Sequence, residues 1–149
     1  MNDSVVERGS FPTLRSVVLD TTDARSLAEF YRQLLAYEYR PGDEPPAAGE
    51  PDPRGNDWLV LVDPAGTARI AFQQVDDLPV STWPENGIPQ QLHLDLSVPS
   101  AEELTVQHGR VLSLGARLLY DRFHHPVEPL YVYADPAGHP FCIFVAPDG

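Results

Sequence analysis

The chain has 149 residues, of which 42 % are apolar, and a net charge of −12 at neutral pH. This length fits one compact domain or two small halves packed together, and the apolar share is enough for a core. Ten basic residues, all of them arginine, stand against 22 acidic ones. This balance argues against nucleic acid and anionic membranes as partners, because phosphate groups attract positive charge.

The single cysteine, Cys142, excludes an internal disulfide and fits a reducing compartment. No apolar run reaches the roughly 18 residues of a membrane span, and the N-terminus lacks the apolar region of a signal peptide. We therefore expect a cytoplasmic protein without a membrane partner.

After a flexible N-terminus over residues 1–11, a first unit over residues 12–78 begins with a strand and an amphipathic helix. Asp23 is the expected N-cap of this helix. The apolar residues that follow have the i, i+3, i+4, i+7 spacing of one buried face: Leu27, Phe30, Tyr31 and Leu34. A second strand is expected over residues 37–40, and the acidic run over residues 43–57 is interpreted as a mobile loop.

The first unit closes with "WLVLVDPAGTARIAF", which predicts two strands joined by an Asp-Pro-Ala-Gly turn. A linker over residues 79–87 leads to a second unit over residues 88–147 with the same plan. Its strand "QLHLDLSV" precedes a helix with a capping box at Ser100 and Glu103, and a strand is expected over residues 117–120. The closing "LYVYADPAGHPFCIF" repeats the strand, turn and strand pattern of the first unit.

This repeat predicts an α+β fold of two βαβββ modules. The doubled plan, the helix start "DARSLAEFY" and the stretches "HLDLSV" and "DPAGHPFCIF" resemble the vicinal oxygen chelate superfamily, the glyoxalase and bleomycin-resistance fold. With "TWPENGIPQQLHLDL", they look like its glyoxalase-like branch. The resemblance implies that the modules form a curved, cup-shaped mixed sheet with a small-molecule ligand in the cup. Since members often pair modules across a dimer, it also implies a homodimer.

The resemblance also implies four strand positions at which metal-dependent members carry His, Glu, His and Glu. Ser16 stands at the first of these positions, and either Ile70 or Ala71 at the second. His93 and Cys142 stand at the third and fourth. A catalytic zinc normally has three protein ligands, so we predict no cofactor. If a divalent metal does bind, His93 is the expected ligand.

Two residues of one strand offer other chemistry. His93 and Asp95 are two apart, so alternation places them on one face. Together they form a candidate acid-base pair or substrate anchor. The alternative is a polar, water-filled groove without catalysis. The thiol of Cys142 is either a nucleophile or a small buried apolar group, the latter being the commoner role.

Other residues are candidates for binding the substrate. Ser16 and Gln73 could donate hydrogen bonds, while His124, in the loop "YDRFHHPVEP", could close over a ligand or simply be solvated. Aromatic residues could line the cup, namely Trp58, Tyr131 and Tyr133, although such residues are more often part of a core. Tyr131 and Tyr133 share a face and are expected beside Cys142. Trp83 is expected to pack between the modules.

Three functions remain open from the sequence. The first is a glyoxalase-like enzyme of unassigned reaction that lacks the usual His/Glu metal site. The second is a non-catalytic drug-binding or resistance protein, for which the acidic charge would favour a cationic ligand. The third is a metal-dependent lyase or dioxygenase with displaced ligands.

Overall fold

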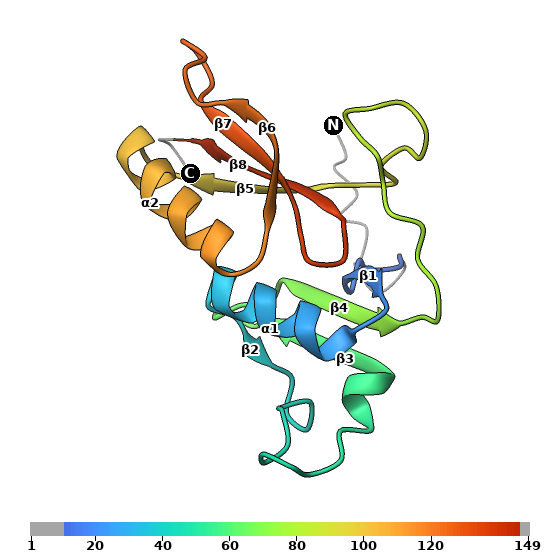
Figure 1. The fold of residues 1–149 in the computed structure, drawn as a ribbon. Helices are drawn as coiled ribbons and strands as arrows, with labels where there is room; N and C mark the ends of the chain where they lie inside the picture. Colours follow the sequence, from blue (N-terminus) through green and yellow to red (C-terminus); the bar gives the residue numbers. More distant parts are fainter. Residues whose placement is uncertain (1–10, 147–149) are drawn as a thin grey trace, which may run out of the picture.

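A computed structural model of the chain describes residues 11–146 as two four-stranded mixed sheets, each carrying an α-helix after its first strand (Figure 1). The first module contains β1 (Val17–Thr21), α1 (Ala24–Leu35), β2 (Glu38–Tyr39), the short 3-10 helix η2 (Arg54–Asn56), β3 (Trp58–Val62) and β4 (Arg69–Gln74). The second contains β5 (Leu94–Val98), α2 (Ala101–Ser113), β6 (Arg117–Arg122), β7 (Leu130–Ala134) and β8 (Pro140–Val145). The predicted pair of βαβββ modules is confirmed.

Two parts of the expected organisation fall outside what the structure describes. They are residues 1–10 of the N-terminus that we expect to be flexible, and residue 147 at the end of the second unit. Within residues 11–146, no helix combines the length and the apolar character needed to cross a membrane.

The first module folds as its sequence pattern predicts. β1 pairs in parallel with β4, and β4, β3 and β2 are antiparallel neighbours. The side chain of Asp23 caps α1 by accepting a hydrogen bond from the N–H of Ser26 at 3.1 Å. The four apolar residues with helical spacing are all buried, since this face of α1 packs against the sheet.

The second module repeats this topology, in the order β5, β8, β7 and β6. The side chain of Ser100 caps α2 by accepting a hydrogen bond from the N–H of Glu103 at 3.2 Å. The Asp-Pro-Ala-Gly turns also form as predicted. Gly66 and Gly138 have φ values of 77° and 96°, a region that glycine enters without steric cost.

The hydrophobic core lies around α1, which packs against both sheets (Figure 1). The ring of Tyr31 lies 5.9 Å from that of Phe72 on β4, and the ring of Phe30 lies 5.9 Å from that of Phe141 on β8. Helix α2 buries only Leu104 and Val111 fully. Because α1 occupies the space between the sheets, the strands of one sheet do not pair with those of the other.

Two polar contacts join the modules near the β7–β8 turn. The hydroxyl of Tyr31 on α1 donates to the buried carboxylate of Asp135 at 2.7 Å. Beside it, Nε2 of His139 lies 2.6 Å from the backbone oxygen of Asp20 on β1. Asp135 also accepts hydrogen bonds from the N–H groups of Ala137 and His139, so this buried carboxylate is well supplied with donors.

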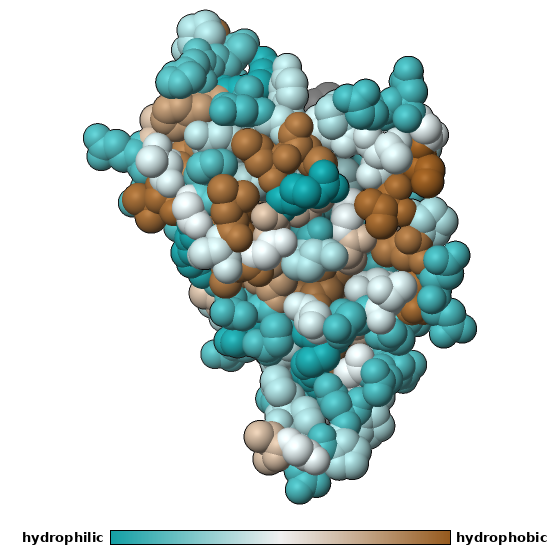
Figure 2. Space-filling model, in the orientation of Figure 1, coloured by the Kyte–Doolittle hydropathy of each residue, from teal (hydrophilic) through white to brown (hydrophobic). Residues whose placement is uncertain are grey.

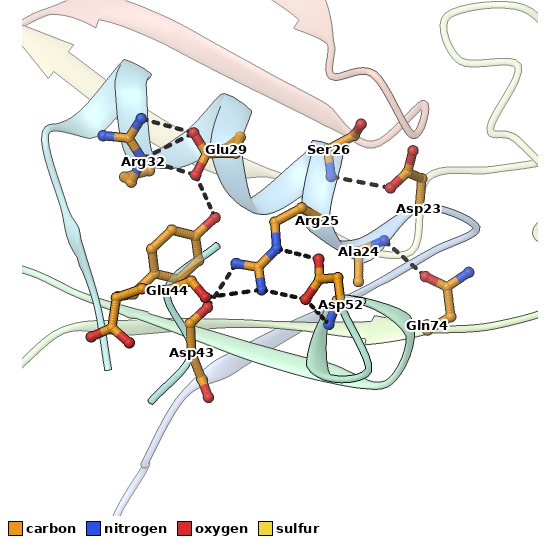
Figure 3. Close-up of polar contacts among 12 residues, drawn as sticks. Asp23, Ala24, Arg25, Ser26, Glu29, Arg32, Asp43, Glu44, Asp52 and Gln74 are labelled. Carbon is orange, nitrogen blue, oxygen red and sulfur yellow. Dashed lines mark hydrogen bonds and ion pairs between the residues drawn. The ribbon is translucent and has the colours of Figure 1, made fainter. Parts of the chain in front are cut away.

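The acidic run over residues 43–57 is anchored at several points, which corrects the interpretation as a simple mobile loop. Arg25 donates from Nε and Nη2 to the two carboxylate oxygens of Asp52, at 2.8 and 2.9 Å, and from Nη1 to the backbone oxygen of Asp43 (Figure 3). The carboxylate of Asp43 is fully buried and accepts from Arg54, Arg40 and the N–H of Val60. These paired charges hold the loop against α1.

Candidate functional site

The second sheet has one face against the helices and one open face. On the parallel β5–β8 pair, Leu94 lies opposite Phe141 and Leu96 opposite Ile143, on the face that packs into the core. The alternating residues point the other way, and there Asp95 lies opposite Cys142. This alternation follows from the two-residue period of a strand.

A cavity of about 320 Å³ lies on this open face, and we call it the cup pocket. Strands β5, β6, β7 and β8 form its floor, while the linker contributes one wall. Its lining residues are Trp83, Gln90, His93, Asp95, Tyr120, Arg122, Glu128, Leu130, Val132, Cys142 and Phe144. Pockets of this kind, mostly apolar with a few convergent polar groups, are typical small-molecule sites.

Three of the predicted site residues meet in the cup pocket. Nε2 of His93 lies 3.2 Å from Oδ1 of Asp95, and the Cys142 thiol donates to the same oxygen at 2.8 Å. His93 precedes the first residue of β5, and the side chains of His93 and Asp95 are 50 % and 57 % exposed. Asp95 is therefore held between two side chains while both members of the His93–Asp95 pair remain open to a ligand.

The environment of Cys142 opposes thiolate formation. Burial raises the pKa of its thiol to about 12, and the hydrogen bond to Asp95 and the nearby carboxylate of Glu128 act in the same direction. A reactive catalytic cysteine has a lowered pKa instead. Cys142 is thus a neutral hydrogen-bond donor to Asp95 at neutral pH.

The strand registers settle which residue of the first module corresponds to Cys142. Val18 of β1 lies opposite Ala71 of β4, as Asp95 lies opposite Cys142 in the second module. The position left open between Ile70 and Ala71 is therefore Ala71. The four positions carry Ser16, Ala71, His93 and Cys142, a set with one imidazole, one protonated thiol and no carboxylate.

This set does not fit the His and Glu ligands that metal-dependent members use. Ser16 offers only a hydroxyl and Ala71 only a methyl group at two of the ligand positions. The thiol of Cys142 must lose its proton before it can bind zinc. Among residues 11–146, no three His, Cys, Asp or Glu side chains gather so that they could hold a metal ion. His93 and Cys142 both contact one oxygen of Asp95, so the carboxylate links the two side chains.

The predicted binding residues of the first module do not line the cup pocket. Ser16 lies just before β1 and is half-buried, and Trp58 lies opposite Gln73 on the β3–β4 pair. Gln73 is exposed and lines a second cavity, between β1 and the linker. These residues share the open face of the first sheet.

The expected position of Tyr131 and Tyr133 in the cup is wrong. Val132, not a tyrosine, lies opposite Cys142 on the β7–β8 pair, so both tyrosines point to the helix side. There Tyr131 stacks on the imidazole of His108 with 4.0 Å between ring centroids, and Tyr133 contacts Nδ1 of His108 through its hydroxyl at 2.7 Å. Both tyrosines are buried. Counting outward from the Asp-Pro-Ala-Gly turn could have predicted this register.

The histidine loop and the linker also differ from expectation. His124 is exposed near the β6–β7 turn, packed edge-on against Phe123, and is not among the cup-pocket residues. Trp83 was expected between the modules but contacts Tyr120 of β6 with 6.4 Å between ring centroids, in the wall of the cup pocket. Sequence reasoning missed Gln90, Arg122 and Glu128, which no motif distinguishes.

The topology and the cup define the class of protein. The two βαβββ modules have the fold of solved glyoxalase/bleomycin resistance/dioxygenase proteins. Residues 16–144 match the glyoxalase-like domain family, and the chain belongs to this family. No curated protein matches the sequence.

Solved structures share the fold at low sequence identity. A glyoxalase/dioxygenase from Nostoc punctiforme is 17 % identical with a TM-score of 0.66, covering 98 % of this chain and 99 % of its own. The fosfomycin resistance protein FosX from Listeria monocytogenes, in complex with Mn(II) and 1S,2S-dihydroxypropylphosphonic acid, is 16 % identical with a TM-score of 0.64, covering 91 % and 93 %. A glyoxalase/bleomycin resistance protein/dioxygenase family enzyme from Burkholderia phytofirmans is 17 % identical with a TM-score of 0.62, covering 90 % and 98 %.

Proposed function

We propose that this protein is a glyoxalase-like enzyme that transfers protons on a small molecule bound in the cup pocket. His93 is the acid-base group and Asp95 orients it. The observation that carries this proposal is the 3.2 Å contact between His93 and Asp95 inside a cavity of about 320 Å³. Of the four positions that carry His or Glu in metal-dependent members, only the third has such a residue, His93, so we assign the central chemical role to the pair.

The contact gives each residue a defined task. If Nε2 of His93 carries the proton and donates it to Asp95, Nδ1 is left with a free lone pair that can accept a proton from the substrate. The carboxylate also stabilises the imidazolium that then forms. Cys142 donates its thiol hydrogen to Asp95, so it is a positioning residue for the carboxylate.

A second charged residue supports this chemistry. Arg122 lines the same pocket, and its guanidinium supplies fixed positive charge. Removing a proton from carbon beside a carbonyl group leaves negative charge on oxygen, which a preorganised cation stabilises. The proposed reaction class is therefore isomerisation or elimination through an enolate-like intermediate.

Kinetics of single variants test the proposal. With any α-oxo or α-hydroxy carbonyl compound that the protein converts, His93→Ala should lower kcat/KM by about a hundredfold or more, the usual contribution of a general base. Asp95→Asn should lower it less, since the imidazole remains. His124→Ala is the matched control, because that histidine lies outside the cup pocket, and it should leave kcat/KM unchanged. Equal rates for the His93→Ala variant and the original protein would remove His93 from this role.

A non-catalytic binding protein is the second candidate function. It is favoured by the two carboxylates of the cup pocket, Asp95 and Glu128, which both raise the pKa of Cys142 and so mark a negative potential at the pocket floor. A protein with this function would sequester a cationic drug without converting it. Cationic antibiotics should then raise the melting temperature while the compound is recovered intact, and no shift with any of them would eliminate this function.

We also propose a homodimer in the cytoplasm. Within one chain the cup pocket is lined by the second module and the linker alone, and the two sheets are not joined. The first module of a second copy would cover the open face of β5 to β8 and bring Ser16 and Trp58 to the cup pocket.

A further inference from the structure

A second cavity lies beside the cup pocket, and we call it the linker pocket. Its volume is about 550 Å³, and it lies between β1, the linker and the β7–β8 turn. The apolar residues of its wall include Val18, Leu78, Val80, Ile88 and Leu92. Three of these are markedly exposed, at 46 % for Val80, 41 % for Ile88 and 43 % for Leu92, and Figure 2 shows apolar side chains gathered along the linker.

Gln90 lines both cavities. Its side-chain oxygen Oε1 is buried and has no hydrogen-bond partner among the described residues. A buried polar atom without a partner costs free energy and calls for an explanation, which a bound ligand with a donor group supplies. The side chain of Gln90 therefore lies at the boundary that the two cavities share.

The two cavities differ in chemical character. The cup pocket carries two carboxylates, Asp95 and Glu128, against one arginine, Arg122. Among the residues that line the linker pocket there is no lysine or arginine, and its single carboxylate is that of Asp20. A ligand that fits both therefore has a cationic, hydrogen-bond-donating head and an apolar tail.

We propose that the ligand of this protein is an amphipathic cation, with its ammonium head in the cup pocket near Asp95 and Glu128 and its alkyl tail in the linker pocket. An N–H of the head donates a hydrogen bond to Oε1 of Gln90, and the tail covers Val80, Ile88 and Leu92. This inference rests on the proposed function in placing the ligand's head at the His93–Asp95 pair, and it adds the class of the ligand and the place of its tail.

Binding of n-alkan-1-amines from butylamine to decylamine tests the inference by calorimetry. Affinity should rise about fourfold for each added methylene while the tail extends into the linker pocket. Alkanoic acids of the same lengths are the matched anionic probes and should bind much more weakly. If no amine binds, or if the acids bind as tightly as the amines, the cationic head is wrong.

Variants of each cavity separate the head from the tail. Ile88→Trp fills the linker pocket and should flatten the dependence of affinity on chain length. Glu128→Gln should weaken every amine by a similar factor, about two- to fivefold, and keep the chain-length dependence. Val127→Trp, at a site 85 % exposed and outside both cavities, is the control and should change neither. A chain-length dependence that survives Ile88→Trp would remove the tail from the linker pocket.

The outcomes distinguish this inference from the proposed enzyme. His93→Ala should abolish proton transfer and leave the chain-length dependence of amine binding intact. Loss of catalysis with no amine binding would overturn the ligand class alone. Amine binding with the expected dependence, together with unchanged catalysis in the His93→Ala variant, would overturn the enzymatic role alone.

Discussion

Asp95 accepts a hydrogen bond from the thiol of Cys142, with 2.8 Å between Oδ1 and Sγ, across the parallel β5–β8 pair. In the first module the corresponding residues are Val18 and Ala71, which make no polar contact of this kind. The polar cup therefore belongs to the second module. At the position where the resemblance implies a metal ligand, Cys142 carries a neutral thiol that donates to the carboxylate of Asp95. Asp95 in turn contacts His93, so these polar side chains of the cup pocket are bonded within the protein.

The reactivity of Cys142 follows from this contact. Its pKa of about 12 means that almost no thiolate is present near pH 8. Alkylation of the folded protein by iodoacetamide should then be at least about a hundredfold slower than that of the unfolded chain, and should continue to rise with pH above about 10. Mass spectrometry of the labelled protein measures both rates.

The Asp95→Asn variant tests the same contact through the alkylation rate of Cys142. It removes the carboxylate that favours the protonated thiol, so the pKa of Cys142 should fall and labelling near pH 8 should accelerate. A labelling rate in the original protein that levels off below about pH 9 would show an ordinary thiol and contradict the geometry.

The contact between Arg25 and Asp52 should stabilise the loop over residues 43–57. Arg25→Gln should lower the free energy of unfolding by roughly 1–2 kcal/mol, because it removes two parallel charge-assisted hydrogen bonds. Arg25→Lys should recover only part of this loss, since an ammonium group cannot form the bidentate contact. Urea denaturation at neutral pH measures the differences, and equal stability of the lysine variant and the original protein would contradict the bidentate role.

The same ion pair predicts a pH dependence. The hydrogen bond from Arg25 lowers the pKa of Asp52. A carboxyl group with a lowered folded-state pKa contributes stability above its unfolded pKa, about 3.9, and that contribution is lost as the pH falls through the folded value. The original protein should therefore lose more stability than Arg25→Gln between about pH 5 and about pH 2. If the free energy of unfolding falls equally with pH in the two proteins, the Arg25–Asp52 ion pair does not contribute as proposed.

The contact between Tyr31 and Asp135 should hold the two modules together. Tyr31→Phe should cost about 1–3 kcal/mol, since it leaves a buried carboxylate without one of its donors. Tyr39→Phe is the matched control, because its hydroxyl also donates to a carboxylate, that of Glu29, but in a half-buried place. A smaller loss is expected there. Equal losses in the two variants would contradict a special role for the contact between modules.

The Tyr31→Phe variant should also respond differently to pH. Burial raises the pKa of Asp135, and the hydrogen bond from Tyr31 works against this rise. A carboxyl group with a raised folded-state pKa contributes stability at low pH that is lost as the pH rises through the folded value. Without the hydroxyl the pKa rises further, so the loss in the variant should be larger at neutral pH than below about pH 4. Denaturation at both pH values measures it.

The homodimer is tested by sedimentation. We expect a mass twice that of the chain, since the open face of the second sheet needs a cover. Tyr120→Glu places a charge on that face at an exposed position and should shift the protein toward monomer. A monomer at every concentration of the original protein would contradict the proposed assembly.

The sequence predicts the positions of helices and strands more reliably than it predicts which face of a strand is buried. Local signals determine the elements, such as the cap at Asp23 and the apolar spacing of α1, and these residues behave as predicted. Alternation likewise brings His93 to Asp95. Which face of β7 enters the core depends on the register across the turn, and Tyr131 and Tyr133 were misplaced for that reason.

The wall of the cup pocket depends on tertiary structure. Trp83 in the linker and Gln90 just after it reach the pocket because this segment folds over the second sheet. Glu128 reaches it from the segment between β6 and β7. The sequence separations between these residues and His93 do not follow a common strand or helix period, so no sequence pattern indicates them. The buried charge of Asp43 was equally hidden in a run whose composition is typical of solvated loops.

Exchange of α-protons in D₂O tests the proposed role of His93 most directly, because it detects proton transfer without requiring net conversion. Glycolaldehyde and dihydroxyacetone are incubated with the protein and followed by ¹H NMR. We predict that the original protein accelerates loss of the α-proton signal, that His93→Ala lowers this rate by about a hundredfold or more, and that His124→Ala does not. Exchange at the same rate in the His93→Ala variant would contradict the account.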